Sequence, residues 1–265
     1  MEFTWRDEAA PGEALAAGGV VISAFPSAGL ATIVAAHYIV RVLNLPRVAR
    51  FESPDLAPIA VVQGGVVNPT VRAYGRADLA LVLSEFPPTP GQANAIATTI
   101  LRTAEERKAR AVLCLEGVVP HPEETPDGSP GAEEPPDEQV WVAYARKDPE
   151  FARSFTAAGA RTLEEGVIGG VSGAMLVQGA GHVMPVAVLL VSARVAEGMP
   201  DHRAGAALIE ALDRLLPELK IDTGPLRAQA EQIEKALRAV MKSHSSSSGS
   251  PSSPSEEPAS PEMYR

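Results

Sequence analysis

Four uninterrupted apolar runs set the strongest limit on how this chain can fold. They have the length of strands, lack the alternating polar residues of a half-exposed sheet, and cover 18–25, 78–86, 110–117 and 184–193. Segments of helical length and pattern accompany them, the clearest at 30–45, 89–109, 201–219 and 222–243. Strands buried on both faces that alternate with helices are typical of a largely parallel sheet flanked by helices. The sequence therefore predicts an α/β fold.

The chain is long enough for one large domain of this kind. Its 265 residues can bury a core without disulfides or metals. Three shorter strand candidates, at 47–53, 58–63 and 70–76, are separated by Pro, Gly and Asn and predict a small antiparallel excursion. Asp148 and Asp201 stand where N-caps of two helices belong. We expect a single α/β domain over residues 1–243.

Two segments have compositions that oppose packing. Residues 119–139 hold seven carboxylates, six prolines and no Lys or Arg, so we expect a solvated loop there. An alternative is that these carboxylates bind Ca²⁺. Their spacing matches no known cation-binding loop, however, and the prolines prevent a tight coordination cage. Residues 244–265 form a Ser- and Pro-rich tail that we expect to be disordered. No metal site is predicted.

Charge and hydropathy exclude several classes of protein. The formal net charge is −10, whereas a general binder of nucleic acid or of an anionic membrane needs a basic surface. We find no run of 18 apolar residues and no signal peptide, so we expect a cytoplasmic protein without a membrane span. A single cysteine, Cys114, excludes an intramolecular disulfide and a cysteine-based zinc cluster, and its apolar neighbours predict a buried thiol.

The segment GGVSGA at 169–174 nearly matches the G-x-S-x-G elbow of hydrolases. In that interpretation Ser172 is the nucleophile and His182 or His202 supplies the base. In the alternative, the glycines let a helix begin close to the sheet and Ser172 caps it. We favour the second interpretation, because Ala174 replaces the last glycine of the motif.

The segment FPSAGLA at 25–31 follows the first predicted strand and opens a helix. Anions bind at this position in many α/β folds, so a ligand pocket here is one possible site. The segment lacks both G-x-G-x-x-G and G-K-[ST], and no cofactor is predicted. The favoured interpretation is a tight strand-to-helix turn. His37, on the helix that follows, is expected to be a packed or interfacial histidine and not a catalyst.

Several short motifs in a fixed order identify a family resemblance. They are SAFPSAGLATIVAAHYIV, SPDLAPIAVV, LVLSEFPPTP, EEGVIGGVSGAML, DHRAGAALIEALDRLL and LRAQAEQIEKAL. Over about 18–240 the chain resembles the proteasome assembly chaperone family, in particular its prokaryotic members. The resemblance implies an α/β fold like that of nucleoside phosphorylases, assembly into a homo-oligomer, and no enzymatic activity.

The sequence ends in Met263, Tyr264 and Arg265. Proteasome activators and several assembly factors end in a hydrophobic residue, a tyrosine and any residue (the HbYX motif), and these three residues match it position for position. The resemblance thus implies an ATP-independent assembly chaperone, gate-opening activator or both, which docks this terminus into pockets between α-subunits of the core proteasome. The alternatives are a small-molecule enzyme or ligand-binding protein that uses a phosphorylase-like pocket at 25–31, and a scaffold whose tail does not dock.

Overall fold

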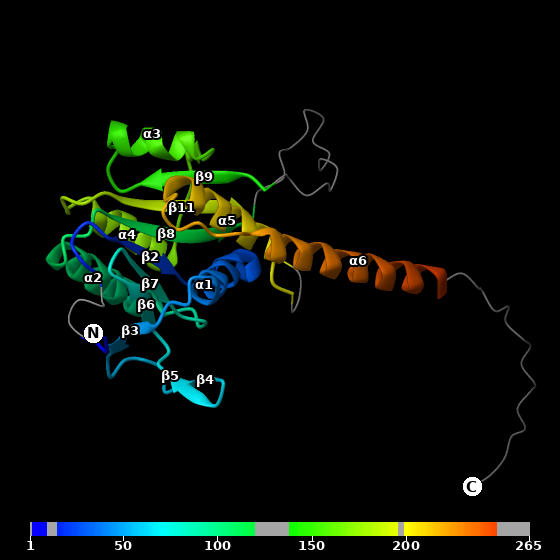
Figure 1. The fold of residues 1–265 in the computed structure, drawn as a ribbon, viewed down its shortest axis with the longest axis horizontal. Helices are drawn as coiled ribbons and strands as arrows, with labels where there is room; N and C mark the ends of the chain where they lie inside the picture. The colour runs from blue at the N-terminus through cyan, green and yellow to red at the C-terminus, as the bar shows by residue number, and fades with distance from the viewer. Residues whose placement is uncertain (1, 10–14, 120–137, 196–198, 248–265) are drawn as a thin grey trace, which may run out of the picture.

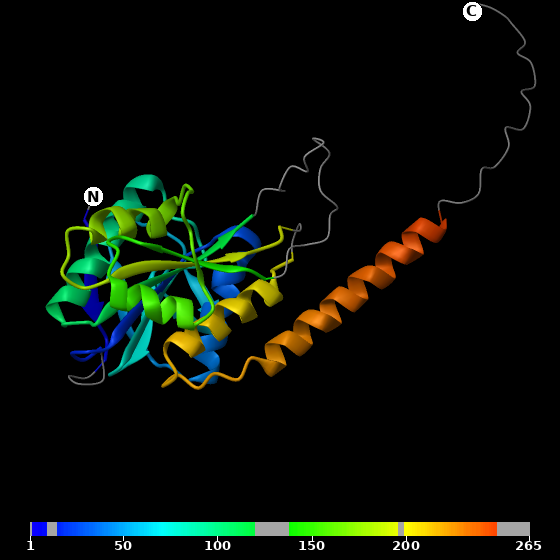
Figure 2. The same ribbon diagram turned by 90° about the horizontal axis from the view of Figure 1, so that it is seen from above.

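The computed structural model describes residues 2–9, 15–119, 138–195 and 199–247. In these ranges the chain forms a nine-stranded sheet with helices on both faces and a two-stranded hairpin beside it (Figure 1). The last helix, α6 (Gly224–Ser247), extends away from this body (Figure 2). None of the helices in the described ranges is long and apolar enough to cross a membrane.

Four parallel strands form the centre of the sheet, in the order β7, β2, β8, β11. Their bounds are β7 (Leu79–Leu83), β2 (Val20–Ala24), β8 (Ala111–Val118) and β11 (Val186–Ser192). Every residue of β2, β7 and β11 is buried. The four apolar runs of the sequence therefore form the parallel centre that they predict, and the α/β fold is confirmed.

Antiparallel strands extend the sheet on both sides. Beyond β7 lie β6 (Arg72–Arg76), β3 (Arg47–Glu52) and β1 (Thr4–Asp7), each antiparallel to its inner neighbour. Beyond β11 lies β9 (Val140–Tyr144), which is antiparallel to it, and then β10 (Arg161–Thr162), which is parallel to β9. The antiparallel excursion predicted from the sequence is confirmed, whereas β1 and β10 are too short and polar to be predicted.

Two helical layers cover the sheet. One contains α1 (Ala31–Val42), which follows a short 3₁₀ turn, together with α3 (Pro149–Ala157) and α5 (His202–Leu215). The other contains α2 (Pro90–Glu106) and α4 (Gly170–Gly179). Alternate residues of the central strands point into opposite layers, so each face of the sheet has its own apolar cluster.

The starts of α2, α3 and α5 follow capping residues that are visible in the sequence. Asp148 accepts hydrogen bonds from two backbone N–H groups in the first turn of α3, and Asp201 does the same for α5, as predicted. Thr89 and Gln92 form a reciprocal capping box at the start of α2. These caps satisfy N–H groups that have no partner inside the helix.

The hairpin beside the sheet consists of β4 (Val61–Gln63) and β5 (Val66–Asn68). Gly64 and Gly65 join the two strands, and their φ angles are 57° and 79°. Positive φ at both positions is what a two-residue hairpin turn requires, and glycine adopts it without steric cost. The sequence predicts the first strand, at 58–63, but not the second.

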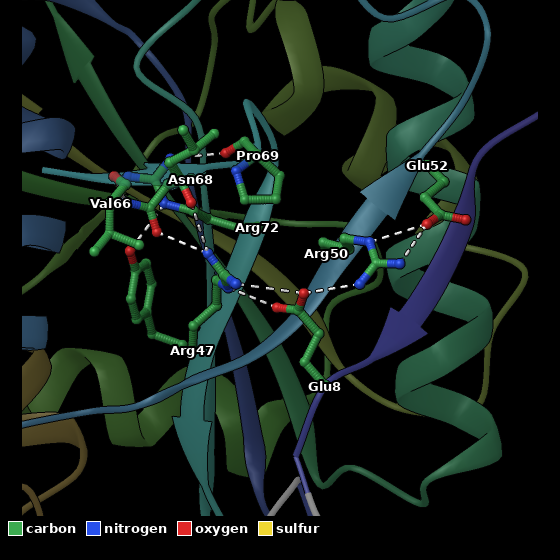
Figure 3. A network of polar contacts seen from close by, with 10 residues as sticks. Glu8, Arg47, Arg50, Glu52, Val66, Asn68, Pro69 and Arg72 are labelled. Atoms are coloured by element: carbon green, nitrogen blue, oxygen red, sulfur yellow. Dashed lines mark hydrogen bonds and ion pairs between the residues drawn. The ribbon is translucent and has the colours of Figure 1, made fainter. Parts of the chain in front are cut away.

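A polar network joins this hairpin to the antiparallel edge of the sheet (Figure 3). The carboxylate of Glu8 lies between two arginines of β3 and accepts hydrogen bonds from Arg47 at 2.6 Å and Arg50 at 2.8 Å. Arg47 also donates to the side-chain oxygen of Asn68 at 2.9 Å, at the end of β5. One guanidinium therefore connects the segment after β1 with the hairpin.

A buried ion pair joins the first residue of β6 to the segment after β7. Arg72, whose side chain is 0% exposed, donates two hydrogen bonds to Glu85, at 2.8 and 2.5 Å, and one to the hydroxyl of Tyr74 at 2.9 Å. A carboxylate oxygen of Glu85 also lies 3.0 Å from Nε2 of His37, whose side chain is 36% exposed, so this histidine contacts the ion pair without being buried. Burial raises the pKa of Glu85, but the hydrogen bonds with Arg72 and His37 outweigh it and lower that pKa from 4.5 to about 2.

Replacing Glu85→Gln tests this pair. The change leaves the Arg72 charge buried without its counter-ion, so we expect the free energy of unfolding at pH 7 to fall by about 3 kcal/mol. Because folding lowers the pKa of Glu85, the ionised carboxylate stabilises the fold above about pH 5, and this contribution is lost as the pH falls toward 2. Urea unfolding of both proteins should therefore give a difference that shrinks between pH 5 and pH 3.

Glu106→Gln is the matched control, because Glu106 is an exposed carboxylate at the end of α2. We expect it to change the free energy of unfolding by less than about 0.5 kcal/mol at every pH. A Glu85→Gln difference that is equally small, or that stays constant from pH 7 to pH 3, would contradict the assigned role of the pair.

The reactivity of Cys114 tests the packing of the central strands. This thiol is 0% exposed in the middle of β8, and burial raises its pKa to about 12. We expect no reaction with an aromatic disulfide reagent at pH 8 in the folded protein, and one reactive thiol per chain in guanidinium chloride. Reaction of the folded protein within minutes would mean that the sheet opens far more readily than its burial implies.

Candidate functional site

The predicted docking residues Met263, Tyr264 and Arg265 lie outside the residues that the structure describes, as does most of the acidic segment 119–139. Among the described elements, α6 is nearest to the docking residues along the chain, and it ends at Ser247. Its attachment to the body is therefore the part of the candidate site that can be built from geometry.

The segment between α5 and α6 is fixed to the body before α6 begins. Leu219 and Ile221 are buried, and the hydroxyl of Tyr38 on α1 donates to the backbone carbonyl of Asp222 at 2.6 Å. In the first turns of α6, Leu226 is also buried, at 3% exposed. These contacts seat the start of α6 in the layer that contains α1 and α5.

Ion pairs surround this seat. Arg227 on α6 donates to both carboxylate oxygens of Glu210 on α5, at 2.5 and 2.8 Å, and to Glu138 at 3.0 Å. Glu138 also accepts from Arg203 at 2.9 Å, and Glu210 accepts from the hydroxyl of Thr223 at 2.9 Å. The sequence analysis did not identify this cluster, because Glu138 and Arg227 are 89 residues apart and no local motif links them.

Ala230 is still buried, and the helix then extends away from the body (Figure 2). Glu231 and Gln232 are exposed and Ile233 is half-buried. A helix rises about 1.5 Å per residue, so the stretch from 231 to 247 spans about 25 Å. The helix runs four residues past the end predicted at 243. Among its described side chains, the buried ones, Leu226 and Ala230, lie in its first turns.

The structure does not bring Ser172 together with a histidine. Ser172 lies in the first turn of α4, is buried, and is hydrogen-bonded with Glu116 on β8. His182 follows the opposite end of α4 and pairs with Glu105 at 3.1 Å. His202 begins α5, in the layer on the other face of the sheet. The residues of the hydrolase interpretation therefore do not form a catalytic group.

The capping role predicted for Ser172 is wrong. α4 begins at Gly170, and its N-cap is Gly169, which has no side chain to accept a hydrogen bond. Gly170 has a φ of 62°, a conformation that favours glycine, so glycine suits the first position of the helix, two residues before Ser172.

The contact of Ser172 with Glu116 affects the carboxyl group. Burial raises the pKa of Glu116 to about 7, although the hydrogen bond with Ser172 opposes this rise.

The loop at 25–31 closes directly onto the sheet. The hydroxyl of Ser27 accepts a hydrogen bond from the backbone N–H of Gly117 at 2.9 Å. A Cβ placed on Gly117 would lie 2.5 Å from the carbonyl oxygen of Ala28, so only glycine fits here. This geometry favours the tight turn over a ligand pocket at 25–31.

The described ranges hold no metal centre, and the hollow that the structure does show lies elsewhere. No group of three or more His, Cys, Asp or Glu side chains there is arranged to hold a metal ion. An open hollow of about 660 Å³ lies at the sheet edge along β1 and β3, and its lining includes Glu2, Phe51, Glu52 and Asp55. The hollow is thus remote in the sheet from the site predicted at 25–31.

A comparison with known sequences finds a relative of similar length. An uncharacterized protein of Methanocaldococcus jannaschii is 27% identical over 225 residues, which are 85% of this chain and 86% of the relative. Residues 21–241 match the model of the PAC2 family. The match includes β7, β8 and β11, all of β2 except Val20, and the base of α6.

Solved structures share the fold. Pyrococcus furiosus PbaA, an archaeal homolog of proteasome-assembly chaperone, has a TM-score of 0.77 and 22% identity, covering 93% of this chain and 94% of that chain. Pyrococcus furiosus PbaB, an archaeal proteasome activator, has a TM-score of 0.71 and 21% identity, covering 91% and 99%. Since the family model spans most of the sequence, the resemblance drawn from its motifs is confirmed and the chain belongs to the PAC2 family.

Proposed function

We propose that this chain is an ATP-independent, non-enzymatic protein of the cytoplasm that binds the core proteasome. It docks Met263, Tyr264 and Arg265 into pockets between α-subunits, as an assembly chaperone, a gate-opening activator or both. The observation that carries the proposal is an HbYX terminus on a PAC2-family chain. The direction of α6 supports it, because a docking segment must be carried clear of the body that presents it (Figure 1).

Two structural relatives support a partner of this kind. PbaA is described as an archaeal homolog of proteasome-assembly chaperone and PbaB as an archaeal proteasome activator. Their identities to this chain are 22% and 21%, at which level the likeness establishes the fold alone. The shared fold and the terminal motif are separate observations, and together they favour the proteasome over other partners.

Each terminal residue has a chemical use in such a pocket. The terminal carboxylate is charged at neutral pH and can pair with a lysine at the pocket edge. Tyr264 brings a rigid apolar ring with one polar end, which suits a half-buried groove. Met263 is flexible and fits an irregular wall. Arg265 contributes mainly through its carboxylate, since the motif accepts any side chain at that position.

Gate opening needs no nucleotide in this scheme. A ligand shifts an equilibrium between closed and open gates only as far as it prefers the open form. Tails that wedge between α-subunits have that preference if their pockets widen when the gate opens. An assembly role needs only the binding step. The two roles therefore use the same docking site and differ in whether binding opens the gate of the α-ring.

Deleting residues 263–265 tests the docking site. We expect full-length protein to stimulate peptide hydrolysis by a cognate core proteasome, and the truncated protein to give no stimulation. Tyr264→Ala removes the apolar ring and should raise the half-maximal concentration roughly tenfold or more. Arg265→Ala is the matched control and should behave like the unchanged protein, since it keeps the terminal carboxylate.

The outcomes separate the two roles. Binding without stimulation, detected by co-sedimentation and lost on deletion of 263–265, would favour the assembly role. The docking proposal fails if neither the full-length nor the truncated protein binds the core proteasome. It also fails if both bind equally well, because the terminus would then contribute nothing.

We also propose that the chain forms a homo-oligomer, as the family resemblance implies. Three residues bind weakly alone, whereas several tails on one particle raise the effective concentration at a ring with several pockets. Light scattering coupled to size-exclusion chromatography should give a mass that is a multiple of 27.7 kDa. A purely monomeric mass at micromolar concentration would contradict this proposal without affecting the docking site.

A further inference from the structure

We propose that Arg227 is a positioning residue, which clamps the base of α6 against Glu210 and Glu138 and thereby fixes the direction in which the tail leaves the body. The functional consequence rests on the proposed docking of Met263–Arg265, whereas the clamp itself is a property of the described residues. Its three members come from three separate parts of the chain.

The contact with Glu210 has the geometry of a directional pair. Nε and Nη2 of Arg227 donate to the two carboxylate oxygens at 2.5 and 2.8 Å, so two parallel hydrogen bonds fix the plane of the guanidinium. The hydroxyl of Thr223 donates to the same carboxylate at 2.9 Å and holds it in place. Since Thr223 directly precedes α6, the helix is held to α5 at its first turn.

The third nitrogen of the same guanidinium reaches another segment. Nη1 of Arg227 donates to Glu138 at 3.0 Å, and the second carboxylate oxygen of Glu138 accepts from Arg203 on α5 at 2.9 Å. Glu138 stands two residues before the start of β9. The base of α6 is therefore braced from two directions, by α5 and by the segment that enters β9.

Apolar contacts alone would not set this direction. Leu226 and Ala230 are 3% and 4% exposed and stabilise the seat of the helix. Apolar burial is non-directional, so these contacts hold the base of the helix on the body but do not by themselves define its tilt and roll. The planar guanidinium fork removes this freedom, because a tilt breaks one or both of its parallel hydrogen bonds.

The exposure of these side chains argues for a positioning role over a stabilising one. Arg227, Glu210 and Glu138 are 36%, 27% and 21% exposed. Solvent screens pairs of this exposure, so each contributes little to the free energy of unfolding. A network of one arginine with two carboxylates still restricts the orientation of the helix. The conformational entropy lost in ordering the Arg227 side chain is shared by both ion pairs.

Because α6 is long, a small change in the angle at its base moves its far end by a large distance. The stretch beyond Ala230 spans about 25 Å, so a swing of about 20° displaces its end by about 9 Å. A tail that starts from a scattered set of positions has a lower effective concentration at a fixed pocket. The clamp therefore acts on tail delivery without touching the partner.

Distances between two spin labels on the full chain test the clamp directly. One label replaces exposed Arg102 on α2 (Arg102→Cys) and the other replaces Ser243 on α6 (Ser243→Cys). Buried Cys114 stays in place, and excess unlabelled chain suppresses distances between copies. In the unchanged background we expect one narrow distance distribution. Arg227→Ala should at least double its width.

Two further variants keep the test decisive if Arg227→Ala folds poorly. Arg227→Lys keeps the charge but loses the planar fork, so we expect an intermediate width. Glu210→Gln keeps the shape of the acceptor but loses its charge and should also broaden the distribution. Arg153→Ala, at an exposed arginine on α3, is the matched control and should leave the distribution unchanged.

A merely structural role predicts a different result. In that case the variants lower the melting temperature while the folded chains keep the narrow distribution. That outcome, or an unchanged distribution in both Arg227→Ala and Glu210→Gln, overturns the proposal whatever the proteasome assay gives.

The proteasome assay separates this proposal from the proposed function. With Met263–Arg265 intact, Arg227→Ala should raise the half-maximal concentration for stimulation or binding roughly threefold or more. If the distances broaden but no version of the chain engages the core proteasome, the clamp stands and the proposed function falls. If the distances broaden and the concentration dependence is unchanged, the clamp has no role in tail delivery and the positioning proposal is overturned.

Discussion

Burial of the central strands on both faces is the constraint on which the rest of the structure depends. Parallel strands cannot be joined by tight turns, so each connection must cross a face of the sheet, and a helix is the element that covers that face. The connections after β2 and β7 place α1 and α2 on opposite faces, and later helices complete each layer. Two apolar clusters result, although aromatic residues make up only 5% of the sequence.

The edges of the sheet follow a different rule, because they are less buried and depend on distant partners. The four-residue strand β1, of sequence TWRD, has no pattern of its own and exists because it pairs with β3, with Thr4 opposite Glu52. Strand β10 has two residues and likewise depends on β9. Local periodicity therefore predicts the centre of this fold, whereas the edges are set by pairing that no local window contains.

The candidate site divides in the same way. The terminal motif stays a prediction, which the sequence permits because its three residues are contiguous. Asp201 could be predicted as an N-cap, and is confirmed as one, because the effect of a cap is local. The cluster around Arg227 is not, because its carboxylates come from α5 and from the segment before β9. The segment around Ser172 shows the limit of a local pattern. The catalytic interpretation, which the sequence did not favour, fails because the fold places His202 on the other face of the sheet, and the favoured capping role fails because Gly169 is the N-cap.

The outer part of α6 extends away from the body, which has a physical cost (Figure 2). An isolated helix of this length is marginal in water, and most helices in proteins gain their stability from an apolar face packed on a core. Among the described side chains of α6, the buried ones, Leu226 and Ala230, lie in its first turns. The ion pairs of Arg227 add a defined geometry to the same turns. A helix held at one end in this way carries the segment that follows it away from the body, which is the arrangement that the proposed docking of Met263, Tyr264 and Arg265 requires.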